Sequence, residues 1–160
     1  MRKIFLVFLI LTSMSTFSQE NSSAGGPPKI NELIGFWKKI DIPNVESMNQ
    51  VNPWPQKYQW FAFYENGKVY SMMSDTEHEY SSKELKAIFK VLPSEKTPNF
   101  ELNGQFLKID NKEIKDYTEI WGVNLFAKDI NEFFKKGNLV MTLDDGKGKV
   151  IYYRLLEKIK

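Results

Sequence analysis

The stretch YQWFAFYENGKVYSMM, residues 58–73, carries the strongest structural signal in this chain of 160 residues. Two β-prone runs flank Asn66 and Gly67, and both of these residues tolerate the positive φ angles of a tight turn. The pattern predicts a β-hairpin with strands over 58–64 and 69–73. It also favours a β fold for the rest of the chain, because 14% of the residues are aromatic.

Similar signals occur on both sides of this hairpin. A first strand is expected over residues 33–42, where Pro43 ends the run. Further hairpins are expected around Asn103 with Gly104 and around residues 144–148, and a long strand is expected over residues 117–126. These tight connections predict an antiparallel meander of about eight strands, which can close into an up-and-down barrel without exposed edges.

One segment changes from strand to helix periodicity. Its apolar residues lie at i, i+3, i+4 and i+7, and these are Leu85, Ile88, Phe89 and Leu92. Ser81 and Glu84 form a capping-box pattern before them, and Pro93 follows. The sequence therefore predicts one amphipathic helix inserted between strands. A short second helix is expected from Asp129 to Gly137.

The N-terminal residues 1–18 have the pattern of a secretory signal peptide. Arg2 and Lys3 precede an apolar run over residues 4–11, and small polar residues follow up to Ser18. The alternative, an uncleaved anchor helix, is disfavoured because a bilayer span needs about 20 apolar residues. We therefore expect an exported protein, in the periplasm or outside the cell, with no membrane span after processing.

The mature chain is expected to contain a flexible leader over residues 19–30 and a single domain over residues 31–160. The leader is rich in glycine, proline and polar residues. Removal of Arg2 and Lys3 leaves 20 acidic residues against an equal number of basic ones. No nucleic-acid partner is expected, because phosphate binding needs a concentrated basic excess. The chain has no cysteine, so stability must come from the core alone.

A family resemblance comes from the two ends of the proposed domain. Gly35, Phe36 and Trp37 form a G-x-W motif within ELIGFWKKI (Glu32–Ile40), and Arg154 lies in VIYYRLLEK near the C-terminus. This combination resembles the lipocalin-like branch of the calycin superfamily, in particular small exported bacterial members. The resemblance implies that the first and last strands pair, and that Arg154 packs across Trp37 to close one end of the barrel.

The aromatic residues suggest where a ligand would bind. Trp60 and Tyr64 share one face of their strand, while Phe61 and Phe63 occupy the other, and one of the two faces must look inward. Trp54, between two prolines, is expected to pack down as a lid. The candidate ligand-binding residues are Trp54, Trp60, Tyr64, Met72 and Trp121. Such walls favour a small hydrophobic or amphipathic ligand, although the same residues could simply fill the core.

Catalytic and metal-binding patterns are few. His78 is the only histidine, within SDTEHEY, where its acidic neighbours lie on a polar connection and are expected to be solvated. One histidine and no cysteine exclude two-histidine zinc sites and cysteine nucleophiles, and no G-x-S-x-G or P-loop pattern occurs. We therefore assign no catalytic residue, no metal and no cofactor.

Two functions remain from the sequence. The first is a secreted or periplasmic, noncatalytic, lipocalin-like protein that binds a small ligand inside a β-barrel. The alternative is a protein–protein interaction module of the cell envelope, with a filled barrel and an envelope protein as its partner. An enzyme is the third and least favoured class.

Overall fold

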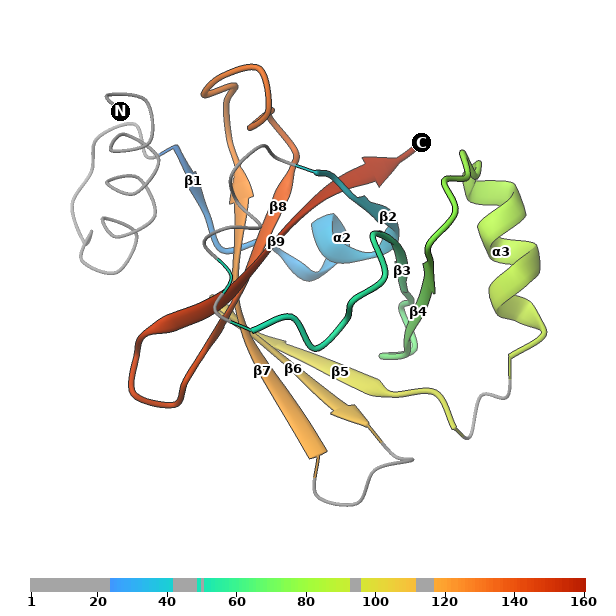
Figure 1. Ribbon diagram of the computed structural model, residues 1–160, viewed down its shortest axis with the longest axis horizontal. Helices are drawn as coiled ribbons and strands as arrows, with labels where there is room; N and C mark the ends of the chain where they lie inside the picture. Colours follow the sequence, from blue (N-terminus) through green and yellow to red (C-terminus); the bar gives the residue numbers. More distant parts are fainter. Residues whose placement is uncertain (1–23, 42–48, 50, 93–95, 112–116) are drawn as a thin grey trace.

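The computed structural model describes residues 24–41, 49, 51–92, 96–111 and 117–160 (Figure 1). The expected signal peptide, residues 1–18, and the first part of the expected leader lie outside these described residues. The elements of the described chain, in order, are β1 (Gly25–Gly26), α2 (Ile30–Leu33), β2 (Gly35–Lys39), β3 (Tyr58–Phe63), β4 (Val69–Ser74), α3 (Ser82–Lys90), β5 (Asn99–Asn103), β6 (Phe106–Asn111), β7 (Tyr117–Phe126), β8 (Leu139–Asp144) and β9 (Val150–Ile159).

All of these strands belong to one antiparallel sheet, which curls into a half-barrel (Figure 1). The strands follow the order β4-β3-β2-β9-β8-β7-β6-β5, and β1 pairs with β7 outside this path. The predicted mainly-β, up-and-down architecture is confirmed. The predicted pairing of the strand that carries the G-x-W motif with the last strand is confirmed as well. β2 pairs with β9, and Trp37 lies opposite Lys158.

The two ends of the strand order, β4 and β5, meet at one corner. There the Phe100 amide donates to the Gly67 carbonyl at 2.8 Å, and the Val69 amide donates to the Pro98 carbonyl at 3.1 Å. Within the described residues, a bridge between Lys68 and Asn99 lies between these two hydrogen bonds. The two ends of the half-barrel are therefore joined at this corner by a short contact and not by a full strand pairing.

The inserted helix α3 forms as the sequence predicts. The Glu84 amide donates to Ser81 Oγ at 3.3 Å, and the Ser81 amide donates to Glu84 Oε2 at 2.8 Å, which completes the capping box. The helix buries Leu85 and Phe89 in a cluster with Trp60 on β3. The helix thereby covers the outer face of this part of the sheet (Figure 1).

The second helix differs in position from the prediction. Residues 129–137 do not form a helix, because local side-chain acceptors fold the backbone into turns. Asn131 Oδ1 accepts hydrogen bonds from the amides of Phe133 and Phe134, both at 2.9 Å, and Asp129 Oδ1 accepts one from the Lys136 amide at 2.8 Å. These bonds replace the helical ones that the start signal at Asp129 and the stop signal at Gly137 suggested.

The short helix of this structure is α2, which precedes the predicted first strand and shares only Leu33 with it. Leu33 ends this helix and is fully buried. Gly35 has a φ of 128°, a conformation that other residues rarely adopt, and it turns the chain from the helix into β2. The G-x-W motif therefore opens a strand, but only after one helical turn.

The sheet has two buried faces with different partners. The inner, concave face holds the main core, which includes Trp37, Phe61, Phe63, Trp121 and Leu156. The outer face of β3 packs against α3. A third cluster, separate from these two, forms around Phe126 and Phe134. Alternate residues of β3 thus enter different clusters, and the strand is buried on both sides.

The described end of the expected leader, residues 24–30, has a defined place. Gly25 and Gly26 pair with Phe126 and Leu125 of β7, and the Ala127 amide donates to the Ala24 carbonyl at 3.0 Å. A Cβ on Gly25 would overlap the Leu125 carbonyl oxygen, whereas one on Gly26 would meet nothing. The glycine that suggested flexibility therefore allows a close strand contact.

This difference between neighbouring glycines gives a test of β1. Gly25→Ala should detach β1 from β7, lower the free energy of unfolding by about 1 kcal/mol for the lost hydrogen bonding, and expose the Ala127 amide to faster hydrogen exchange. Gly26→Ala is the matched control and should leave the exchange unchanged. Equal exchange at Ala127 in both variants would contradict the pairing.

Candidate functional site

A cavity of about 120 Å³ lies in the concave side of the half-barrel. Its wall combines residues of six strands with two loop residues: Trp54, Phe61, Phe63, Val69, Ser71, Met73, Pro98, Ile109, Glu119, Met141 and Arg154. Most of these are apolar, and Glu119 and Arg154 are the two charged residues among them. Ser71 is exposed to solvent, so the cavity reaches the surface beside β4.

Arg154 is the central feature of this site. It lies on the same face of β9 as Tyr152 and Leu156, which belong to the main core. Its direct partner on β8 is Met141. The Arg154 residue is only 4% exposed. The period of the strand therefore turns a cation into the interior of the half-barrel.

Aromatic rings surround the Arg154 guanidinium. Its Cζ lies 4.6 Å from the ring centroids of both Trp54 and Phe61, 4.8 Å from that of Trp121 and 5.5 Å from that of Tyr152. The negative faces of aromatic rings attract a cation, and the attraction grows as water is removed. We call these four residues the aromatic cage.

The cage does not satisfy the hydrogen-bonding groups of Arg154. Its Nε and Nη2 atoms are buried and have no hydrogen-bond partner. Burial lowers the pKa of Arg154 below its ordinary value, whereas Tyr152 and Glu119 act in the opposite direction. A guanidinium nevertheless stays charged in proteins, so the site holds a desolvated positive charge with unused donors.

Glu119 is the carboxylate on the cavity wall, and it serves another partner. Its Oε2 accepts a hydrogen bond from Trp121 Nε1 at 2.7 Å. This bond orients the Trp121 indole against Arg154. In the described part of the chain, no carboxylate forms an ion pair with Arg154.

Trp54 packs against the interior and not into solvent. Its ring centroid lies 5.3 Å from those of both Trp121 and Tyr152. Gln59 Nε2 donates to the Trp54 carbonyl at 3.3 Å and to the Gln56 carbonyl at 3.1 Å, which holds the proline-rich loop against β3. Trp54 is thus placed over the Arg154 guanidinium, where a lid would lie.

The residues that the sequence suggested for ligand binding divide between the two faces of the sheet. Trp54 lines the cavity and belongs to the aromatic cage, and Trp121 belongs to the aromatic cage. Trp60, Tyr64 and Met72 lie in the cluster with α3 on the outer face. All five therefore cannot line one cavity.

Several residues of the cavity wall carry no ligand-binding signal in the sequence. Strand alternation only separates Phe61 from Trp60, and no local pattern marks Glu119 or Met141. Alternation along a strand tells which residues share a face, but only the packing of α3 shows which face is the inner one. One signal for Arg154 is present in the sequence. Residues two apart on a strand share a face, so Arg154 and Tyr152 lie on one face of β9.

The pair expected to close the barrel, Trp37 and Arg154, is arranged differently. Trp37 is fully buried, and its Nε1 donates to the Leu33 carbonyl at 2.8 Å. The cation over its ring is Lys158, with Nζ 5.1 Å from the ring centroid. The strand register is the reason, because it sets Lys158 opposite Trp37 and carries Arg154 further along β9 to the aromatic cage.

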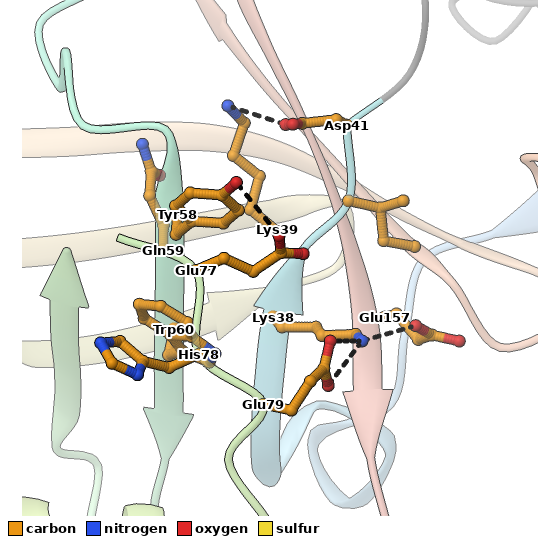
Figure 2. A pocket seen from close by; sticks show the side chains of 11 residues that line it. Lys38, Lys39, Asp41, Tyr58, Gln59, Trp60, Glu77, His78, Glu79 and Glu157 are labelled. Carbon is orange, nitrogen blue, oxygen red and sulfur yellow. Dashed lines mark hydrogen bonds and ion pairs between the residues drawn. The ribbon is translucent and has the colours of Figure 1, made fainter. Parts of the chain in front are cut away.

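A second pocket of about 210 Å³ lies at the surface beside β2 and β3 (Figure 2). Its charged side chains pair with one another: Lys38 Nζ lies 3.4 Å from Glu79 Oε2 and 3.8 Å from Glu157 Oε2. His78, on the rim, lies with its ring centroid 5.4 Å from that of Tyr80. This pocket is larger, and its lining includes Gln59, whose buried Oε1 has no hydrogen-bond partner among the described residues.

The described residues contain no group of three or more His, Cys, Asp or Glu side chains placed to hold a metal ion. None of the helices in this part of the chain has the length and apolar character that crossing a membrane requires.

The fold is an antiparallel, mostly-β half-barrel that is compatible with a calycin-like architecture. No protein-family model matches the chain, and searches of curated proteins and of solved structures also gave no match. The site must therefore be interpreted from its own geometry.

The unpaired charge of Arg154 leads to a stability prediction. Arg154→Met keeps an unbranched, largely apolar side chain and removes the desolvated charge, so its free energy of unfolding should equal or exceed that of the parent protein. Arg154→Ala should lower it by about 2–5 kcal/mol, because a cavity remains inside the aromatic cage. Urea unfolding measures both values. A loss of more than about 2 kcal/mol in Arg154→Met would show that the attraction between cation and rings outweighs desolvation.

Proposed function

We propose that this chain is a noncatalytic, lipocalin-like protein that binds a small hydrophobic or amphipathic ligand in the concave side of its half-barrel. The observation that carries the proposal is the aromatic-walled cavity, which contains a buried arginine with unused hydrogen-bond donors. Ligand sites in proteins commonly combine apolar walls with a few polar groups that fix orientation.

The lipocalin-like part of the proposal has support in the topology. The G-x-W motif lies at the start of β2, and β2 pairs with β9, the last strand. The connections between neighbouring strands are up-and-down, and α3 is inserted between β4 and β5. Both features agree with the resemblance that the sequence suggested.

The volume of the cavity limits the ligand. At about 120 Å³ it is smaller than the sites of drug-sized molecules, which occupy roughly 300–1,000 Å³. An apolar cavity of about 150 Å³ is large enough for benzene. The cavity here is somewhat smaller but opens to the surface at Ser71, so part of a ring-sized ligand would lie in its mouth. We therefore propose a ligand with one ring or a short chain.

Tryptophan fluorescence tests this function. A titration with ring-sized compounds such as benzoate and benzyl alcohol should change the emission, because Trp54 and Trp121 lie at the site. The change should be reduced in Trp54→Phe and retained in Trp60→Phe, because Trp60 lies on the outer face under α3.

A second pair of variants tests the location of binding. Ser71→Phe should weaken binding at least tenfold, because its side chain would fill the mouth of the cavity. Met72→Leu, the next residue on the opposite face of β4, should leave binding unchanged. No binding by any ring-sized compound, or equal binding in the two variants, would overturn the proposal.

The alternative function is an interaction module of the cell envelope with a filled barrel. The small volume of the cavity favours it, because large side chains occupy most of the interior. The same titration separates the two functions, since a module with a filled barrel would give no saturable change in emission.

We also propose export to the periplasm or the medium. The support is the pattern of residues 1–18, in which two basic residues precede a short apolar run. Expression of the full chain in a bacterial host should give a secreted product whose N-terminal sequence begins at Gln19. A product that keeps Met1 and remains in the cytoplasm would contradict export.

A further inference from the structure

We propose that the cavity recognises a compact monocarboxylate, whose two oxygens bind one edge of the Arg154 guanidinium while a small apolar body fills the remaining space. This inference rests on the proposed ligand-binding function and names the chemical class of the ligand.

The two unused donors of Arg154 belong to the same edge of the guanidinium. Nε carries one hydrogen, and Nη2 carries another that points in nearly the same direction. This edge matches the spacing of the two oxygens of a carboxylate, which can accept both hydrogen bonds at once. A neutral carbonyl or hydroxyl offers one oxygen and cannot use the edge fully.

The aromatic cage fixes the orientation of that edge. Trp54, Phe61 and Trp121 each lie within 4.8 Å of the Arg154 Cζ. Rings at this distance restrict rotation of the guanidinium and keep water away from it. A hydrogen bond to a desolvated charge is stronger than one in water, so a ligand carboxylate would gain from an interaction that is already oriented.

The charges at the site limit the ligand to a single negative charge. Glu119 also lines the cavity, and its Oε2 is held by Trp121. A second negative charge on the ligand would be repelled by this carboxylate in a medium of low dielectric constant. One anionic ligand group would complement Arg154 and leave Glu119 with its own hydrogen bond.

The rest of the cavity wall selects the body of the ligand. Apart from Ser71 at the mouth it is apolar, and its members include Phe63, Val69, Met73, Ile109 and Met141. These side chains offer no partner to a second polar group. A ring or short alkyl chain attached to the carboxylate fits these apolar walls and brings no second polar group.

The experiment compares benzoate with benzamide, which has nearly the same shape but no charge. Calorimetric titration of the parent protein should show at least tenfold tighter binding of benzoate. Terephthalate, with a second carboxylate, should bind at least tenfold more weakly than benzoate. The Arg154 Hε and Nε NMR signals should shift on addition of benzoate and stay nearly unchanged with benzamide.

Two variants show which cation is responsible. Arg154→Met should abolish the preference for benzoate over benzamide. Lys158→Met is the matched control, because Lys158 lies on the same face of β9 but over Trp37, and its preference should equal that of the parent protein. If Arg154→Met does not fold, the comparison of benzoate with benzamide and the Arg154 signals in the parent protein still decide the question.

The outcomes separate this inference from the proposed function. Equal affinity for benzoate and benzamide would overturn the carboxylate site and leave the binding function standing, with ordered water satisfying the Arg154 donors. Binding of neither compound, nor of any other ring-sized one, would overturn both. A preference that survives in Arg154→Met and disappears in Lys158→Met would place the anion at the other cation.

Discussion

The pairing of β2 with β9 is the constraint on which the rest of the structure depends. It joins the N-terminal strands β2, β3 and β4 to the C-terminal strands β5 to β9, so that the strand order runs from β4 through β2 and β9 to β5. Its register sets Lys158 opposite Trp37 and Leu156 opposite Lys39, which fixes how far along β9 Arg154 lies. With another register, the aromatic cage could not form around this arginine.

The buried guanidinium gives the interior its chemical character. A charged group withdrawn from water is costly unless other groups replace its hydration. Here four aromatic rings contact the cation, while the donors of one edge stay without a partner. Rings compensate for the charge but not for directed hydrogen bonds, so the Nε and Nη2 donors of Arg154 stay without an acceptor among the described residues.

Much of the fold could be predicted from local patterns. The hairpin around Gly67, the capped helix α3 and the long strand β7 form where the sequence indicates, because turn, capping and alternation depend on neighbouring residues. The errors also have local causes. Asp129 and Asn131 fold a predicted helix into turns, and Gly25 forms a strand contact in a predicted flexible leader.

The sequence by itself determined the class of fold and the parity of each strand, because the strand period assigns alternate side chains to opposite faces. It placed Phe61 and Trp60 apart, but it could not tell which of them faces inward. Only the tertiary structure decided that, because α3 packs on the outer face of β3 and leaves Phe61 inside with Arg154. Tertiary structure also decided that Lys158, and not Arg154, lies beside Trp37. This follows from the register between two strands that are more than a hundred residues apart in the sequence.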